Sequence, residues 1–266
     1  MDSRSKRMRS PQTSEYQEPE SPSLQSLPRS RTKSESGSLL NRIARNFAAL
    51  VNLVGRWQLI ACVAIALALT QLSLLILQNP LLPAELEFMQ WFQQAIPPAI
   101  GNIWGKIFFA CDAEVSATVV VISILVLSWR KLWHEAFFIA IAAAGAIGMN
   151  DLLFKPFFAR ERPPLFDDPT ISGYAFPSGH AFGNLMLYFF LAYLLSAHFP
   201  KLTNYFYGAA IVFIASMGLG SMYLGVHWLT DVIAGYGVGF IWLTICLTLL
   251  KLSKRKFPSP RLPWQN

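Results

Sequence analysis

Six long apolar runs, separated by short polar segments, are the feature that most limits what this chain can fold into. A helix needs about 20 apolar residues to cross the roughly 30 Å hydrocarbon core of a bilayer. The runs lie at about 57–77, 107–129, 133–154, 181–197, 205–223 and 232–250. Charged residues make up only 14% of the chain, well below the roughly 25% of a soluble domain. We therefore predict an all-α integral membrane protein built as a bundle of six spans.

The segments outside these runs are of two kinds. Residues 1–45 are rich in Ser, Pro, Gln, Glu and Arg, and such a segment buries too little surface to offset its ordering entropy. We predict a disordered tail there, a membrane domain at 46–256 and a short tail at 257–266. Between the first two spans, residues 79–106 contain four prolines around the stretch 85–94. We expect an amphipathic helix in that stretch, lying at the membrane interface with its Trp and Phe side chains toward lipid.

Basic residues lie mostly on one side of the six-span arrangement. Ten precede the first span, and the others are Arg130, Lys131, Lys201, Lys251, Lys254, Arg255, Lys256 and Arg261. Because cytoplasmic loops carry an excess of Lys and Arg, we predict that both termini are cytoplasmic in a multi-pass protein of the plasma (inner) membrane. The formal net charge of +7 is explained by this asymmetry, so no nucleic-acid partner is expected.

Three polar clusters interrupt the apolar sequence. They are Lys155–Pro163, Pro177–His180 and Tyr223–Asp231, and each lies at the end of a span. The six-span arrangement places all three on the same, non-cytoplasmic face. Nothing in the choice of spans required that agreement, so we expect the three clusters to form one site.

The first two clusters suit a phosphoryl group. Lys155 and Arg162 are cations, and the planar guanidinium matches two phosphate oxygens. Asp151, four residues before Lys155, can orient the ammonium group on a helix. In Pro177–His180, Gly179 lets the backbone approach closely, and the amides at the start of the fourth span point toward an anion.

Two histidines with different neighbours fit a two-step phosphoryl transfer. If the segment is helical, Asp231 meets His227, fixes its tautomer and makes the other ring nitrogen a better nucleophile. His180 can protonate the leaving alcohol and then activate water. The competing interpretation of Asp231 is a helix N-cap for the sixth span, which is compatible with orienting His227. We expect no cofactor and no metal, because the cations offset the phosphate charge and no compact ligand set has metal-binding spacing.

The three motifs together resemble the type 2 phosphatidic acid phosphatase (PAP2) family, in its membrane lipid phosphatase branch. Six residues separate Lys155 from Arg162-Pro163, Pro-Ser-Gly-His follows, and three residues separate His227 from Asp231. The resemblance covers roughly the second to the sixth span and implies a six-helix membrane fold. It also implies roles for residues: nucleophile His227, its partner Asp231, general acid His180, and phosphate ligands Lys155, Arg162, Ser178 and Gly179.

One position departs from the family pattern. The third motif usually begins Ser-Arg, with the Arg six positions before the nucleophilic histidine, whereas this chain has Gly220 and Ser221 there. A charge-assisted hydrogen bond of the kind lost is worth about 1.5–3 kcal/mol. Two consequences stay open: the loss lowers the rate, or Arg160 binds phosphate in its place.

We therefore expect a metal-independent phosphatase that acts on a lipid phosphate or lipid diphosphate at the outer membrane face, through a phosphohistidine. Phosphatidate, phosphatidylglycerophosphate and an isoprenyl diphosphate all fit this site, with membrane lipids as the other partners. The alternative is a weakly catalytic or non-catalytic membrane protein that binds lipid phosphates, because Ser221 replaces the cation. Haloperoxidase-type oxidation is disfavoured, since the relatives with that chemistry are soluble.

Overall fold

The computed structural model describes residues 41–42, 45, 48–49, 51–165 and 173–257, and all regular structure within those ranges is helical. The all-α class is therefore confirmed for this part of the chain. The tails expected at 1–45 and 257–266 fall almost entirely outside the described residues.

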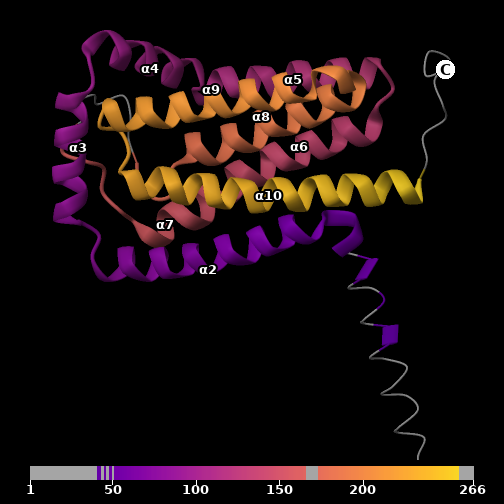
Figure 1. Cartoon of the computed structure of the whole chain (residues 1–266), viewed down its shortest axis with the longest axis horizontal. Coiled ribbons are helices and arrows are strands. Elements are labelled where there is room, and N and C mark those ends of the chain that lie inside the picture. The colour runs from indigo at the N-terminus through magenta and orange to yellow at the C-terminus, as the bar shows by residue number, and fades with distance from the viewer. Residues whose placement is uncertain (1–40, 43–44, 46–47, 50, 166–172, 258–266) are drawn as a thin grey trace, which may run out of the picture. The chain divides into compact units, whose positions relative to one another are not determined.

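Five helical segments are long and apolar enough to cross a membrane (Figure 1). They are α2 (Arg56–Gln78), the run Trp133–Phe158, α8 (Gly179–His198), the run Pro200–Tyr223 and α10 (Leu229–Lys256). The run Pro200–Tyr223 consists of a short 3-10 turn, η2 (Pro200–Leu202), followed by α9 (Thr203–Tyr223). Each of the five contains one of the apolar runs that the sequence predicts.

The remaining predicted span, at 107–129, is broken. Its residues belong to α4 (Pro98–Ala110) and α5 (Ala113–Trp129), whose axes differ by 53° and which together form a sixth candidate span. The break has a local cause, because the Asp112 carboxylate accepts a 2.8 Å hydrogen bond from the Ala113 amide and caps α5. The expected start at residue 107 is therefore wrong, since it falls inside α4.

The third span changes its winding before it ends. It begins as α6 (Trp133–Ile147), widens into a π-helical segment, η1 (Gly148–Phe154), and closes as α7 (Lys155–Phe158). Ala159 then ends the helix in a left-handed conformation, with a φ of 45°. Isolated π-helical turns are rare and occur often at functional sites. Here the turn lies directly before the first polar cluster.

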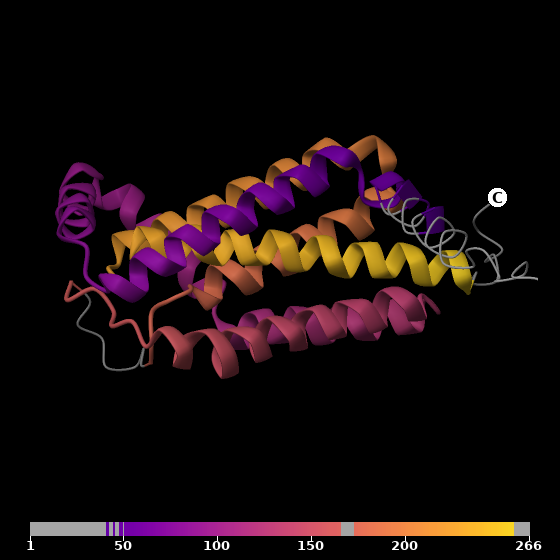
Figure 2. The ribbon, with the colours of Figure 1, turned by 90° about the horizontal axis from the view of Figure 1, so that it is seen from below.

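Small residues allow the helices to pack closely around α10. A Cβ atom on Gly235 would lie 2.5 Å from the Ser178 carbonyl oxygen, and one on Gly239 would lie 2.9 Å from that of Phe182. Such small residues bring helix backbones together in membrane proteins. On another side of α10, Gly237 faces Leu69 of α2, and Figure 2 shows these two helices side by side. The start of α8 is therefore held against the first turns of α10.

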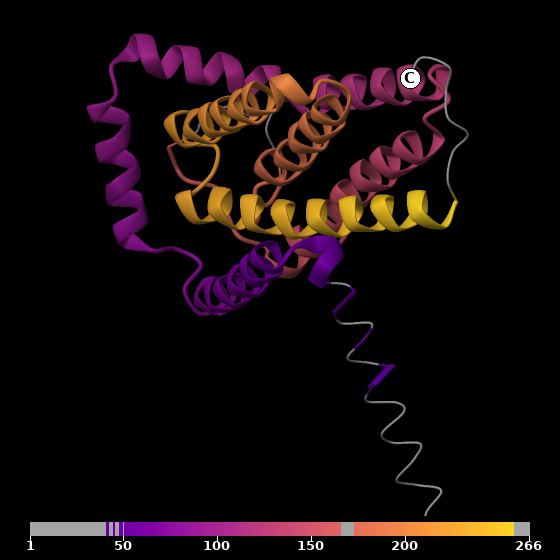
Figure 3. The same cartoon turned by 45° about the vertical axis from the view of Figure 1, so that its right-hand side comes forward.

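The helix α3 (Pro83–Ala95) runs across one end of the bundle, between α2 and α4 (Figure 3). This is the amphipathic helix expected between the first two spans. Its orientation differs in part from the expectation, because Trp91 is exposed but Phe92 is buried and stacks on Trp104. Glu85 and Met89 share the buried face with Phe92.

Candidate active site

His227 lies in the turn that joins α9 to α10, at the end of the bundle that α3 crosses (Figure 1). Gly225 has a φ of 74°, which favours glycine, and it lets the chain reverse. The Ser221 carbonyl accepts a 2.9 Å hydrogen bond from the Val226 amide and so holds the turn against α9. His227 is consequently fixed and almost completely buried.

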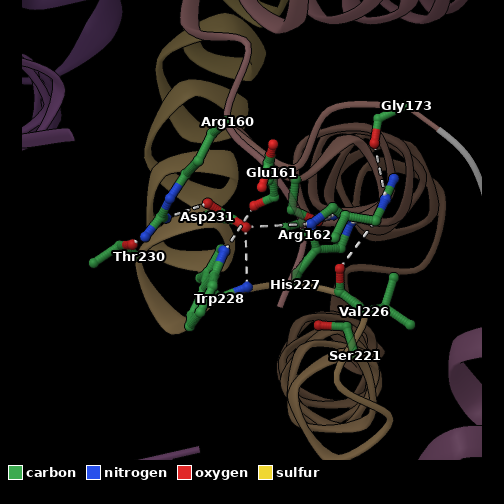
Figure 4. A network of polar contacts seen from close by, with 12 residues as sticks. Arg160, Glu161, Arg162, Gly173, Ser221, Val226, His227, Trp228, Thr230 and Asp231 are labelled. Carbon is green, nitrogen blue, oxygen red and sulfur yellow. Dashed lines mark hydrogen bonds and ion pairs between the residues drawn. The ribbon is translucent and has the colours of Figure 1, made fainter. Parts of the chain in front are cut away.

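Asp231 faces His227 and also caps α10. Its Oδ2 accepts a 2.9 Å hydrogen bond from the Trp228 amide and lies 3.6 Å from His227 Nδ1, within ion-pair distance (Figure 4). His227 precedes the first residue of α10, Leu229, so the two groups do not meet along a helix as the spacing suggested. The capping turn brings them together instead, and Asp231 serves both of the roles considered for it.

Two cations of the first cluster reach this turn or its surroundings. Arg162 donates a 3.0 Å hydrogen bond from Nη1 to the Val226 carbonyl, and the same nitrogen lies 3.4 Å from His227 Nε2 (Figure 4). Burial lowers the pKa of Arg162 and the Asp231 charge opposes that effect; a guanidinium still stays charged in proteins. Lys155 forms a 2.7 Å ion pair with Asp151 through the i, i+4 spacing.

The second cluster lies against the first. Ser178 caps α8, since its hydroxyl accepts a 3.3 Å hydrogen bond from the Ala181 amide, and its own amide donates to the Asp231 carbonyl. A Cβ atom on Gly179 would lie 2.6 Å from Asn150 Nδ2 and 3.9 Å from Lys155 Nζ. Any larger residue at position 179 would require the Asn150 side chain to shift, so a glycine there lets α8 approach η1 closely.

His180 lies across from His227. Its ring stacks on Phe108 at 4.4 Å between centroids, and the two imidazole rings are 6.5 Å apart. His180 Nε2 lies 3.4 Å from the carboxylate of Asp112, at the break between α4 and α5. Asp112 is not among the site residues predicted from the sequence, because hydropathy gives no signal that it reaches the site.

Arg160, the further candidate for a phosphate ligand, binds other groups of the protein in this structure. Its donors are directed to buried partners: Nε to the Pro80 carbonyl, Nη1 to Thr230 and Asp231, and Nη2 to Glu85, at 2.6–2.8 Å. The side chain is completely buried over the Trp228 ring. Arg160 holds Asp231 in place and leaves the position of the missing family arginine unfilled.

That position, Ser221, is a packing position here. Its hydroxyl donates a 2.8 Å hydrogen bond to the Gly218 carbonyl, and the residue is buried. A Cβ atom on the preceding Gly220 would clash with the backbone of Trp104 in α4. The two residues that replace Ser-Arg therefore allow α4 to pack against α9.

Sequence reasoning missed Glu85, which accepts hydrogen bonds from Arg160 and Thr230. A signal for it existed, because Glu85, Met89 and Phe92 have the i, i+4, i+7 spacing of one helix face. A carboxylate on such a face has to find a buried partner. Within the described part of the chain, no three His, Cys, Asp or Glu side chains lie close enough together to hold a metal ion.

An apolar groove of about 370 Å³ opens beside these residues. Its walls come from α2, from α10 and from the segments next to the first two clusters, and they include Leu69, Phe154, Phe158, Phe176, Pro177 and Val238. Phe154 directly precedes Lys155 and Pro177 directly precedes Ser178. The lining of the groove therefore includes residues that are next in sequence to Lys155 and Ser178.

Comparison with known proteins gives three further findings. Residues 133–255 match the family model described as PAP2 superfamily. Phosphatidylglycerophosphatase B of Bacillus subtilis is 30% identical over 46% of this chain and 61% of its own length. Lipid A 4'-phosphatase of Porphyromonas gingivalis is 32% identical over 50% of this chain and 61% of its own length. The chain thus spans about three fifths of the length of each of these relatives.

A solved structure shows the same fold. The crystal structure of a transmembrane PAP2 type phosphatidylglycerolphosphate phosphatase from Bacillus subtilis superposes with a TM-score of 0.63 and 24% identity, over 75% of this chain and 98% of that one. Together with the apolar helices, this fold identifies a multi-pass membrane protein. The resemblance carried by the three motifs is confirmed, because residues 133–255 of this chain match the PAP2 superfamily model and both curated relatives are lipid phosphatases by name.

Proposed function

We propose that this protein is a phosphatase that removes phosphate from a lipid phosphate or lipid diphosphate through a phosphohistidine on His227. One observation carries the proposal: His227 Nε2 lies 3.4 Å from Arg162, while its other nitrogen faces Asp231 at 3.6 Å. The nitrogen that can attack is thus the one beside a phosphate-binding cation. The two curated relatives support this class, because both are named as phosphatases of lipids.

The reaction has two balanced steps. In the first, His227 Nε2 forms a bond to phosphorus, the bond from phosphorus to the lipid oxygen breaks, and His180 gives that oxygen a proton. In the second, His180 takes a proton from water, the water oxygen attacks phosphorus, and the bond from phosphorus to nitrogen breaks. Inorganic phosphate leaves, and both histidines return to their starting protonation states.

The charges around His227 suit both steps. Burial lowers the pKa of His227, with Asp231 opposing that effect, so the imidazole is unprotonated at neutral pH and can attack. The ring gains positive charge as it bonds to phosphorus, and the Asp231 carboxylate stabilises that charge. Lys155 and Arg162 stabilise the oxygens of the transferred group, a contribution that in other phosphatases comes from a metal ion.

The apolar groove favours a lipid substrate. It adjoins both phosphate-binding clusters through Phe154 and Pro177, and its walls are almost entirely apolar. An acyl or prenyl chain in the groove would place the attached phosphate next to Lys155 and Ser178. The non-catalytic alternative is not favoured, because the relatives are phosphatases and the His227, Asp231 and His180 side chains lie together.

The proposed face of the membrane follows from charge. The connections from α5 to α6 and from α8 to α9, which carry Arg130, Lys131 and Lys201, lie at the end of the bundle opposite to the turn from α9 to α10 (Figure 1). Since basic residues favour the cytoplasm, the site would open to the outer face of the plasma membrane, with both termini cytoplasmic.

Phosphate release by the purified full chain in detergent with EDTA tests this function. Phosphatidate, phosphatidylglycerophosphate and an isoprenyl diphosphate would be compared for wild type, His227→Ala and the control His134→Ala. His134 lies at the opposite end of the bundle, where it contacts Ser253 at 2.8 Å. We expect release by wild type and His134→Ala and a loss of at least about 1000-fold in His227→Ala. Equal release by His227→Ala, or dependence on added metal, would overturn the mechanism.

A further inference from the structure

We propose that Glu85 of α3 is a positioning residue for the nucleophile: it offsets the charge of Arg160 and so leaves Asp231 able to support positive charge on His227. This inference rests on the proposed function and assigns a new role within it. Glu85 touches neither histidine in the described contacts and acts through its two neighbours.

Glu85 is bound on both carboxylate oxygens. Oε2 accepts a 2.8 Å hydrogen bond from Arg160 Nη2, and Oε1 accepts bonds of 2.7 Å and 2.8 Å from the amide and hydroxyl of Thr230. Thr230 lies in the first turn of α10, one residue before Asp231. Glu85 therefore fixes both Arg160, which binds Asp231, and the first turn of α10, which contains Asp231.

The three charged groups form a buried set with an excess of negative charge. Arg160 is one cation, Glu85 and Asp231 are two carboxylates, and their side chains are 0%, 5% and 0% exposed. Charges interact strongly at such burial because water screens them little. If Glu85 were neutral, Arg160 would pair with Asp231 alone, and the set would have no net charge to offer His227.

The other groups facing His227 make that excess important. They are Asp231 from α10, Arg162 from the segment after α7, Lys155 from α7 and His180 from α8. Arg162 and Lys155 both disfavour a positive imidazole. Among these groups Asp231 is the carboxylate. If its negative charge were neutralised by Arg160, none of the other groups named here would stabilise a positive His227.

The first test replaces Glu85→Gln in the full chain, with Glu87→Gln as the matched control. Glu87 lies on the same helix but is exposed. The dependence of kcat/KM on pH would be measured with one lipid phosphate, so that titration of the substrate is common to all variants. Removal of a buried negative charge makes His227 harder to protonate, and we expect the acid limb to move to lower pH by roughly half a unit or more. We also expect kcat to fall by about tenfold as nucleophilicity weakens.

Two further variants separate charge from structure. Glu85→Gln/Arg160→Gln removes the cation as well and restores the excess negative charge, so its acid limb should return toward that of wild type. Glu85→Asp keeps the charge with a shorter side chain, and its limb should stay in place even where kcat falls. Melting temperatures in detergent identify variants that do not fold. If Glu85→Gln folds and the acid limb of its kcat/KM profile lies at the same pH as in wild type, the proposal is overturned, whatever the change in kcat.

The test also distinguishes this proposal from failure of the phosphatase function. If wild type releases no phosphate, the proposed function fails, but the titration of His227 can still be followed by NMR of histidine-labelled protein. The chain has 4 histidines, and the His227 signal is the one that His227→Ala removes. A lower midpoint in Glu85→Gln than in Glu87→Gln would support the role of Glu85, and equal midpoints would overturn it.

Discussion

Ser221 occupies the position at which the PAP2 pattern has a cation, and its surroundings indicate that none is accommodated there. The side chain is buried and donates to the Gly218 carbonyl at 2.8 Å, while its own carbonyl holds the turn that carries His227. A serine in this setting contributes packing and one neutral hydrogen bond. In the proposed mechanism, phosphate binding would then depend on Lys155 and Arg162 without a third cation.

We predict that Ser221→Ala keeps phosphate release within roughly threefold of wild type, because it removes no charge from the site. Ser221→Arg would have to place a long side chain in a filled space, and we expect it to lose about 1–3 kcal/mol of stability. Activity assays and melting temperatures in detergent would measure both effects. A Ser221→Arg variant that is stable and faster than wild type would contradict this, and would show that the site lacks a cation that it can use.

For single residues, the sequence predicted contacts between side chains that lie a few positions apart in the chain. The i, i+4 spacing of Asp151 and Lys155 predicted their ion pair, which is 2.7 Å long. The sequence left open whether Arg160 binds phosphate in addition to Arg162, the predicted phosphate ligand two positions away. Only the fold shows that the first turns toward Glu85 and Asp231 and the second toward His227.

The start of α8 is the element on which the candidate site depends most closely. Gly179 is its first residue and lies against Asn150 of the π-helical segment, next to Lys155. Hydropathy cannot distinguish a π-helical turn from an α-helix, so the sequence located the polar residues of this segment but not its winding. In the same way, the apolar residues of α4 and α5 were predicted as one span, because hydropathy does not register the cap that the single polar residue Asp112 makes.

We predict that Gly179→Ala separates α8 from η1, since its Cβ atom would lie 2.6 Å from Asn150 Nδ2. Overpacking of this kind costs about 1–3 kcal/mol, and a shift of His180 away from the site should lower kcat at least about tenfold. Gly183→Ala is the matched control, because it lies on the same helix with no atom within 4 Å of the added Cβ. Equal kcat values for the two variants would show that the contact with Asn150 does not position His180.

The two ends of the membrane domain differ in charge and in polar content. The end away from His227 carries the basic loops and the C-terminal turns of α10, where Lys254 pairs with Glu135. The other end carries Lys155, Arg160 and Arg162, and each of these is bound to a carboxylate or lies beside His227. Cations with such partners are explained by their contacts and do not indicate how the protein is oriented in the membrane. Its orientation is therefore predicted from the basic residues of the opposite end.

This charge asymmetry predicts that the candidate site opens to the outside of the cell. In a chain whose cysteines Cys62, Cys111 and Cys246 are replaced, single cysteines would be placed at Glu87, on the helix that crosses the site end, and at Lys201, at the opposite end. Both positions are exposed. A membrane-impermeant maleimide added to intact cells should label Glu87→Cys, and it should label Lys201→Cys only after permeabilisation. The reverse pattern would place His227 on the cytoplasmic face, and the lipid phosphates available to the enzyme would then be those of the inner leaflet.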